Sequence, residues 1–270
     1  MKPVLFSIGS FPVRSYGVAM ALAFLLGIWL ARRRARDQGL DPDTIIDFSF
    51  YVIVLSIVGA RAVFVAQHWS YFQLHPAGIV RIWDGGLAQY GGVLAGLATG
   101  LIYFARKGID PWRGADIVAP SVALGIAVGR IGCFLNGCCF GRPCSLPWAV
   151  RFPADSHAAE LFPGQAVHPT QLYESGAALL ILAVLLIADR RKPFHGFTLW
   201  FFVMLLAVFR FLVDPIRQYG EASIAFRAGE TAVTMNQLAG LILIAVAAVF
   251  MAVLARRGRP EPGSSPPTEE

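Results

Sequence analysis

Three arginines lie within apolar segments of the chain, where an ionised side chain is costly. Arg61 lies in SFYVIVLSIVGARAVFVAQ, Arg130 in PSVALGIAVGRIGCFLNGCCFGR and Arg210 in FTLWFFVMLLAVFRFLVDPIRQ. A charge inside lipid costs about 2.5–3.5 kcal/mol on insertion scales, so such residues usually face a polar cavity or a partner. The guanidinium fork also fits phosphate oxygens. The three arginines therefore predict a site for an anionic headgroup. The alternatives are arginines that snorkel to the interface or pair with a helix carboxylate.

Two polar motifs add candidate residues to such a site. GRIGCFLNGCCFGR holds Arg130, Asn136 and Arg142 at steps of six residues, and its glycines leave backbone N–H groups accessible to an anion. HPTQLYE places His168 and Tyr173 at the entry of an apolar segment. A lone histidine is more often structural, but beside Gln, Tyr and Glu a role in binding or catalysis has equal support.

A third motif, FRFLVDPIRQ, combines two arginines with an aspartate. Arg210, Asp214 and Arg217 stand at i, i+4 and i+7, which predicts that they share one face of a helix. The motif fits a binding face, and it fits equally an internal ladder of ion pairs.

The four cysteines follow the spacing C-x4-C-C-x4-C, from Cys133 through Cys138 and Cys139 to Cys144. Zinc and iron–sulfur sites commonly use C-x2-C pairs, and histidine is absent from this stretch, so the spacing predicts no metal site. Nothing adjacent in sequence indicates a catalytic thiol. In an oxidising external loop, a disulfide among Cys138, Cys139 and Cys144 is compatible with the sequence.

The segment WDGGLAQYGGVLAGLATG is rich in glycine. Every fourth residue from Gly92 to Gly100 is glycine, a spacing that lets membrane helices pack closely. The pairs at 85–86 and 91–92 lie where a helix is expected to begin, which suits a turn or a re-entrant backbone beside a ligand. Tyr90 stands between the pairs, either as an interfacial anchor or as a hydrogen-bond donor in the cavity.

The composition indicates the elements that position these residues. The chain has 270 residues, of which 56% are hydrophobic and 15% charged, and its mean hydropathy is +0.59. We expect an all-α, polytopic membrane protein, one transmembrane domain over residues 1–257, and a disordered cytoplasmic tail at 258–270. The first span lacks the features of a cleaved signal peptide, so it is expected to be retained. About seven spans are predicted, near 15–31, 45–66, 87–105, 116–136, 173–188, 196–213 and 237–255.

The distribution of charge predicts the orientation. Four basic clusters stand at alternate span ends, which places them all on one side, the cytoplasmic one by the positive-inside rule. The N-terminus is then outside, the C-terminus is cytoplasmic, and 137–172 is an external loop. Arg130, Asn136 and Arg210 fall toward the outer side, so a site open to the outside is expected. The net charge of +6 does not indicate nucleic-acid binding, because these basic residues serve as topology signals.

Taken together, the motifs resemble one family, the prolipoprotein diacylglyceryl transferases of bacterial inner membranes. The resemblance implies seven membrane helices, phosphatidylglycerol as the lipid donor, and a prolipoprotein whose lipobox cysteine becomes a thioether as glycerol phosphate leaves. It covers most of the chain and is carried, in family order, by SYGVAMALAFLLGIWLARRRA, GARAVFV, WDGGLAQYGGVLAG, GRIGCFLNGCCFGR, HPTQLYE, FRFLVDPIRQ and TMNQLAG.

The resemblance also implies roles for individual residues. Arg130 and Arg210 match the two key arginines thought to hold the lipid phosphate. Positions of the same family cavity are matched by Tyr16, Asn136, Gly141, His168 and Tyr173. Arg61, Asp214 and Arg217 from the arginine patterns join these residues in the predicted binding site. His168 and Tyr90 join Arg130 and Arg210 as catalytic candidates.

Four positions depart from the family pattern. Asp214 stands where the family usually has Glu, and Tyr90 where many members carry a histidine proposed as a base. Cys133 replaces the usual Asn of the signature and Cys138 a common Glu. A thiol with a pKa near 8.5 is already a few per cent ionised at neutral pH, so a strong base is helpful but not obligatory. Tyr90 is therefore expected to orient groups.

Two other functions compete with the transferase. The arginines could bind small anions or lipids in a transporter, although the internal repeats common in transporters are not apparent. A family member with an altered acceptor could instead bind lipid or act on a different thiol. In each case the expected partners are membrane lipids, and no cofactor is expected.

Overall fold

A computed structural model describes residues 4–9, 11–154, 156–219, 224–228 and 231–257, and most of them are helical. The chain divides into two compact units, with boundaries inside two long helices. One unit comprises Met1–Trp29 and Val118–Glu270, and the other Leu30–Ile117. The predicted tail at 258–270 lies outside the described residues, and a single domain over 1–257 remains a prediction.

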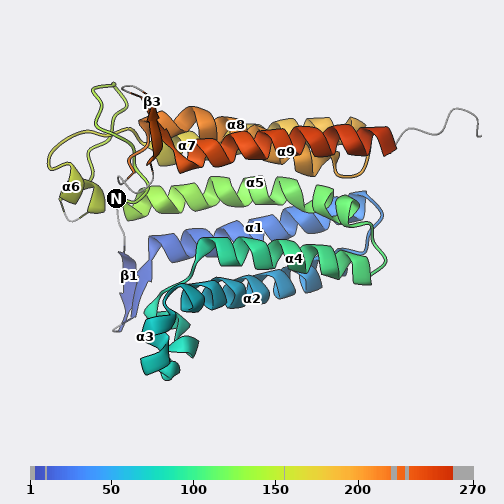
Figure 1. Cartoon of the computed structure of the whole chain (residues 1–270), viewed down its shortest axis with the longest axis horizontal. Coiled ribbons are helices and arrows are strands. Elements are labelled where there is room, and N and C mark those ends of the chain that lie inside the picture. Colours follow the sequence, from blue (N-terminus) through green and yellow to red (C-terminus); the bar gives the residue numbers. More distant parts are fainter. Residues whose placement is uncertain (1–3, 10, 155, 220–223, 229–230, 258–270) are drawn as a thin grey trace, which may run out of the picture. The chain divides into compact units, whose positions relative to one another are not determined.

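A long helix covers each of the seven segments predicted to span the membrane (Figure 1). Six of the described helices are long and apolar enough to cross a membrane; α4, which contains several glycines, is not among them. The all-α polytopic class is confirmed, whereas the seventh span and the orientation of the termini stay predictions. The long helices are α1 (Ser15–Asp37), α2 (Pro42–Gln67), α4 (Gln89–Arg106), α5 (Pro111–Asn136), α7 (Thr170–Ala188), α8 (Phe197–Val213) and α9 (Met235–Arg257).

Short elements connect the long helices. Two antiparallel hairpins, which the sequence did not predict, directly precede α1 and α9: β1 (Val4–Ile8) with β2 (Phe11–Arg14), and β3 (Ile224–Ala228) with β4 (Thr231–Thr234). The other short elements are α3 (Trp69–Leu74), α6 (His157–Leu161) and the 3₁₀ turns η1 (Pro76–Val80), η2 (Ile82–Asp84), η3 (Asp189–Arg191) and η4 (Asp214–Ile216).

In the unit Leu30–Ile117, α2 and α4 pack closely because glycines remove side chains from their contact. A Cβ at Gly91 would overlap the carbonyl oxygen of Gly59 and lie 2.8 Å from Cβ of Val63. A Cβ at Gly96 would lie 2.9 Å from Oγ of Ser56. The glycine-rich face of α4 is thus a helix-packing surface, as the spacing predicted.

The two glycine pairs behave differently. Gly85 and Gly86 have φ angles of +88° and +77°, which favour glycine and form the predicted turn. Gly91 and Gly92 lie inside α4, where they contribute to packing. The expectation of a turn at 91–92 is wrong, because the close approach of α2 accounts for glycine there.

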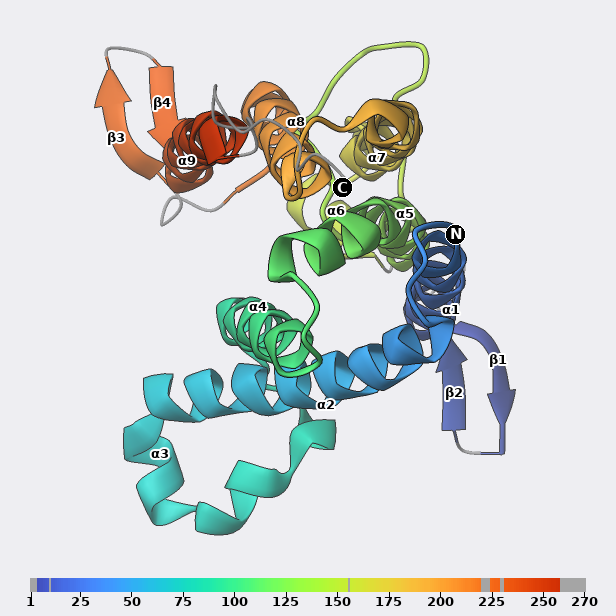
Figure 2. The same cartoon turned by 90° about the vertical axis from the view of Figure 1, so that its right-hand side faces the viewer.

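In the other unit, α5, α7 and α8 enclose a common apolar core. Its buried members are Ala119, Ala123, Ile181, Leu185 and Phe202. The other face of α8 packs on α9, where Trp200 and Phe250 stack with ring centroids 4.3 Å apart. Viewed along the helices, α7, α8 and α9 follow one another (Figure 2). These helices form the scaffold for the polar residues at the ends of α5, α7 and α8.

A short charged hinge separates α7 from α8. Oδ1 of Asp189 accepts a hydrogen bond from Oγ1 of Thr198 at 2.6 Å and pairs with Nζ of Lys192 at 3.4 Å. Gly196 turns the chain with φ of +93° just before α8 begins. Two separate helices form, as the sequence predicted.

The loop after α5 has a small core of its own. Phe140, Ala158 and Val167 are buried together, and Val167 bridges to both Pro143 and Val150. Oγ of Ser156 accepts a hydrogen bond from the backbone N–H of Ala159 and caps α6. The loop can therefore hold residues in fixed positions beside the helix ends. Its placement on the external side stays a prediction.

We expect Gly91→Leu to disrupt the packing of α2 on α4, because a side chain there meets the backbone of Gly59. Overpacking usually costs about 1–3 kcal/mol, and backbone overlap puts this change at the upper end. A lower melting temperature in detergent is the measurement. Gly100→Ala is the control, since its Cβ would lie 3.7 Å from Phe48, an ordinary contact. Equal melting of the two variants would contradict the packing role.

Candidate functional site

Glu174, in the first turns of α7, is the centre of a cluster of three arginines. Its carboxylate, only 3% exposed, forms an ion pair with Nε of Arg130 at 2.6 Å and accepts a hydrogen bond from Nη1 of Arg210 at 3.0 Å. Nη1 of Arg217 contacts the same carboxylate. One negative charge for three guanidiniums leaves a formal excess of two positive charges. The cluster is therefore suited to hold an anion.

The three arginines differ in their access to a ligand. The side chains of Arg130 and Arg210 remain 24% and 26% exposed, whereas that of Arg217 is 9% exposed. Arg130 contacts Glu174 through Nε, so among the described residues its two terminal NH₂ groups remain for another acceptor. Arg130 and Arg210 can thus meet a ligand, and Arg217 supports them from the buried side.

Three helices bring the cluster together. Arg130 lies in the last turns of α5, and Arg210 in the last turn of α8. Oγ of Ser175 donates to the backbone carbonyl of Ala127 at 2.8 Å, which fixes α7 against α5 next to Glu174. Apolar packing of these helices sets the positions of the charges.

The predicted face shared by Arg210, Asp214 and Arg217 is wrong. Because Pro215 cannot continue the helix, α8 ends at Val213 and the chain enters the turn η4. Asp214 is 1% exposed, and its Oδ2 accepts a hydrogen bond from Oγ1 of Thr234 at 2.5 Å. Asp214 thus ties η4 to the start of α9, while both arginines reach Glu174.

Tyr219 contacts two of the three arginines, Arg210 and Arg217. Its hydroxyl accepts a hydrogen bond from Nη2 of Arg210 at 3.2 Å, and the guanidinium of Arg217 lies 5.4 Å from its ring centre. Burial raises the pKa of Tyr219, although the charges of Arg217 and Arg210 oppose that shift. Tyr219 is therefore a neutral phenol that orients both guanidiniums.

His168 and Tyr173 form a second polar group at the entry of α7. Nδ1 of His168 lies 3.4 Å from the hydroxyl of Tyr173, which accepts a hydrogen bond from Nε1 of Trp148 at 2.7 Å. Both residues are partly buried, so they could contact a ligand. The structure brings the predicted pair together and adds Trp148 from the loop.

Gly141 allows the loop to approach this entry. Its N–H donates to the carbonyl of His168 at 2.9 Å, and the residue bridges to Arg217. A Cβ at Gly141 would lie 2.7 Å from Cβ of His168 and 2.8 Å from Cγ2 of Thr170. Gly141 therefore links His168 to the arginine cluster by close backbone packing.

Three cysteines converge beside the cluster. Gly137 and Cys139 have positive φ angles of 72° and 62°, which turn the chain back at the end of α5. As a result, the sulfur atoms of Cys133, Cys138 and Cys139 lie within 4.8 Å of one another. Hydrogen bonds with Cys133 and Cys138 lower the pKa of the Cys139 thiol, and the charges of Arg130 and Arg217 lower it further.

All four cysteines are free thiols. The disulfide envisaged among Cys138, Cys139 and Cys144 is not formed, and the grouping differs from the expected one. Cys133 from α5 joins the adjacent pair, whereas the backbone N–H of Cys144 pairs with Ala166 across the loop. Sequence spacing missed the convergence because it depends on the turn at Gly137 and Cys139.

Tyr16 and Asn136 lie next to these cysteines. Tyr16 is at the start of α1, where a Cβ on Gly132 would lie 3.5 Å from its ring, so α1 and α5 are in contact there. Asn136 ends α5, and its side chain forms a hydrogen bond with Cys138. Both predicted residues therefore border the cysteine group.

Arg61, in the other unit, has a different role from the predicted headgroup binding. Its guanidinium donates to the backbone carbonyls of Gly78, Ile79, Arg81, Gly85 and Gly86 at 2.5–3.2 Å. A guanidinium has five N–H donors, and five carbonyls use them. Arg61 thus holds the segment 78–86, and no donor remains for a phosphate.

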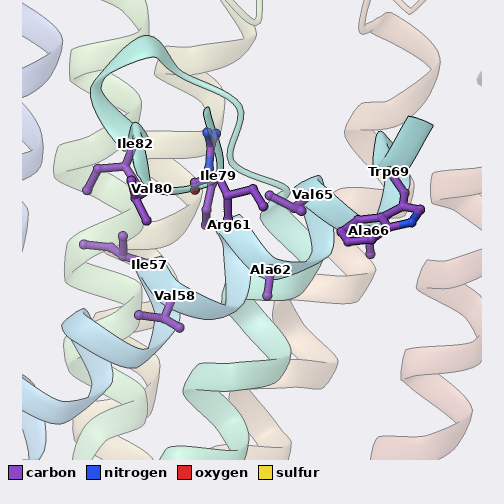
Figure 3. A pocket seen from close by; sticks show the side chains of 10 residues that line it. All are labelled: Ile57, Val58, Arg61, Ala62, Val65, Ala66, Trp69, Ile79, Val80 and Ile82. Carbon is purple, nitrogen blue, oxygen red and sulfur yellow. Dashed lines mark hydrogen bonds between the residues drawn. The ribbon is translucent and has the colours of Figure 1, made fainter. Parts of the chain in front are cut away.

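The segment held by Arg61 covers one side of an apolar pocket of about 600 Å³ (Figure 3). Ile57, Val58 and Val65 line it from α2, and Val80 and Ile82 from the segment itself. Tyr90, the remaining predicted residue of this unit, lies near the start of α4 and is 77% exposed.

Three residues that the geometry makes important are not among the predicted site residues: Glu174, Tyr219 and Trp148. Glu174 stands in HPTQLYE, where it entered the argument only as a neighbour of His168. A glutamate at the entry of an apolar segment, in a chain with arginines inside other apolar segments, was a usable signal. Tyr219 and Trp148 carry no local pattern, because their contacts depend on how the loops fold.

Comparisons with known proteins point to one family. The family model described as prolipoprotein diacylglyceryl transferase matches residues 3–253. A phosphatidylglycerol–prolipoprotein diacylglyceryl transferase of Symbiobacterium thermophilum is 37% identical over 251 residues, covering 91% of this chain and 92% of its own. Proteins of the same name from Thermosynechococcus vestitus and Bacillus licheniformis are 37% and 33% identical, covering 78% and 96% of this chain and 79% and 94% of theirs.

We expect Arg61→Lys to loosen the segment 78–86, because an ammonium group cannot serve five carbonyls in a plane. Hydrogen bonds to charged groups contribute about 1.5–3 kcal/mol each, so a clear loss of stability follows. Faster protease cleavage within 78–86 and a lower melting temperature are the measurements. Arg81→Lys is the control, because the exposed Arg81 contributes its backbone carbonyl to the contact. Lost activity with unchanged melting and cleavage would indicate that Arg61 binds substrate.

Proposed function

The chain belongs to the prolipoprotein diacylglyceryl transferase family, and on that premise we propose that Arg130 and Arg210 hold the phosphate of phosphatidylglycerol during transfer. The diacylglyceryl group passes to a prolipoprotein, as the names of the relatives state for those proteins. The acceptor atom is the thiol sulfur of a lipobox cysteine. The reaction takes place in the bacterial inner membrane, at a site open to its outer side.

The reaction replaces a carbon–oxygen bond with a carbon–sulfur bond. The acceptor thiol releases its proton to water, and the thiolate attacks the glyceryl carbon that carries the phosphate ester. The bond from that carbon to the phosphate oxygen breaks, and glycerol phosphate leaves with the electron pair. Negative charge therefore grows on the phosphate, where fixed positive charge lowers the barrier.

The observation that carries the proposal is the charge balance around Glu174. Three arginines share one buried carboxylate. The two with partly exposed side chains, Arg130 and Arg210, are the ones that the family resemblance implies hold the lipid phosphate. The excess positive charge matches the charge that develops on the leaving group. Because Glu174 orients the guanidiniums beforehand, little reorganisation is needed during the reaction.

The other predicted residues take supporting roles in this proposal. His168 and Tyr173 contact the substrates from the entry of α7, and Gly141 keeps them close to Arg217. Tyr16 and Asn136 border the same end of α5. Asp214 and Arg217 position Arg210 from the buried side. The phenol of Tyr90 orients one of the substrates through a hydrogen bond.

A transporter of small anions or lipids would also use exposed arginines, but it would form no covalent product. The decisive assay incubates the purified protein with phosphatidylglycerol and a lipobox peptide, and detects the thioether-linked diacylglyceryl peptide by mass. A peptide with Ser in place of its cysteine controls for the nucleophile. Binding of phosphatidylglycerol without any product would favour a transporter or a member with an altered acceptor.

We expect Arg130→Ala and Arg210→Ala each to abolish transfer while the protein still inserts in the membrane. Each change removes a positive charge that faces the phosphate. Arg→Lys at either position should restore little activity, because an ammonium lacks the bidentate fork. Product formation and the amount of protein in the membrane fraction are measured together.

Arg151→Ala is the matched control for these variants, because Arg151 is an exposed arginine of the loop outside the cluster. It should keep the activity of the unaltered protein. Near-normal transfer by both Arg130→Ala and Arg210→Ala would refute the phosphate-holding role.

Tyr90→Phe should lower activity about tenfold, equivalent to about 1.4 kcal/mol of barrier, since it removes one orienting hydrogen bond. Tyr90→His should be tolerated, because the family resemblance implies a histidine at the matching position. The rates are compared at neutral pH and at about pH 9, where more of the acceptor thiol is ionised. A Tyr90→Phe variant that is inactive at neutral pH but recovers at about pH 9 would identify Tyr90 as the base.

A further inference from the structure

The three cysteines at the end of α5 form a group that the proposed transfer reaction does not use. Cys133 lies on α5, and Cys138 and Cys139 follow the turn at Gly137. Their sulfur atoms all lie within 4.8 Å of one another, and each side chain is partly accessible. Three thiols this close together are an arrangement suited to a thiophilic cation.

We propose that Cys133, Cys138 and Cys139 bind a thiophilic d¹⁰ cation such as Zn²⁺ through three thiolates. Zinc–sulfur bonds are about 2.3 Å long, so sulfur ligands in a tetrahedral centre lie about 3.8 Å apart. The observed separations, at most 4.8 Å, need a contraction of about 1 Å or less, which rotation of the side chains supplies. The fourth position is left for water or another ligand.

The backbone around two of the ligands is already fixed. The carbonyl of Cys138 accepts from Nε2 of Gln171 at 2.7 Å, and that of Cys139 from Oγ1 of Thr170 at 2.8 Å. Thr170 and Gln171 are fully buried at the start of α7. The two adjacent thiols are therefore held opposite Cys133 in the absence of any cation, which lowers the entropic cost of binding.

The surrounding charge also favours the complex. Three thiolates with one Zn²⁺ carry a net charge of −1. Arg130 lies three residues before Cys133 on α5, on the same face of the helix. Its cluster with Arg210, Arg217 and Glu174 has more positive than negative groups. The positive charge of the cluster therefore compensates the negative charge of the complex.

A disulfide is the alternative use of these residues, but the geometry favours a cation. A disulfide would join two of the sulfur atoms, would need an external oxidant, and would leave the third without a role. The structure instead brings all three sulfur atoms within 4.8 Å of one another. Cys144, whose backbone pairs with Ala166, is outside this group and serves as the matched control.

The test uses the full-length protein purified in detergent under nitrogen, freed of metal with a chelator, and titrated with Co²⁺. We expect one equivalent to bind with a thiolate-to-cobalt charge-transfer band, which Zn²⁺ then abolishes by displacement. Cys133→Ser and Cys139→Ser should weaken binding at least about hundredfold, since each removes a ligand. Cys144→Ser should titrate like the unaltered protein.

Three outcomes would overturn the proposal: no charge-transfer band in the unaltered protein, a loss of the band in Cys144→Ser, or a disulfide within the group in the protein as isolated. The last is read by mass after alkylation. The titration follows metal binding directly, so its result is independent of whether the arginine cluster catalyses diacylglyceryl transfer.

Discussion

The polar end of the larger unit depends on one buried carboxylate that three arginines share. Without Glu174, Arg130, Arg210 and Arg217 would bring three positive charges together in a region of low dielectric. Breaking a buried ion pair by removing one partner typically costs about 3–5 kcal/mol, because the remaining charge is left uncompensated. Here a single carboxylate compensates only part of the charge. The structure thus tolerates the cluster while keeping it attractive to an anion.

The position of Glu174 in turn depends on contacts that carry no charge. Oγ of Ser175 fixes α7 to α5 through the carbonyl of Ala127. Gly141 lets the loop lie against His168 and Thr170. These contacts bring residues that are far apart in sequence to one place, so a change in packing there would alter the electrostatics of the cluster. Small residues near the site therefore influence its electrostatics through packing.

The sequence was sufficient to predict the long helices and to select Arg130 and Arg210 as candidate site residues. The apolar segments located all seven long helices, and the glycine spacing located the packing face of α4. It was insufficient wherever a tertiary turn decided the outcome. Pro215 ended α8 and moved Asp214 to Thr234, and the turn at Gly137 and Cys139 made neighbours of cysteines whose spacing resembles no common metal motif.

Arg61 and Arg130 show why an apolar segment cannot by itself assign a role to its arginine. Both are charged residues among hydrophobic neighbours, and both avoid lipid by finding polar partners. Arg61 donates hydrogen bonds to five neutral carbonyls, which use all its donors. Its guanidinium therefore holds the segment 78–86 in place. Arg130 meets a carboxylate through Nε and stays partly exposed, so its terminal donors can bind a ligand. The number of donors left unused, rather than burial or charge, separates a structural arginine from one that can hold a substrate phosphate.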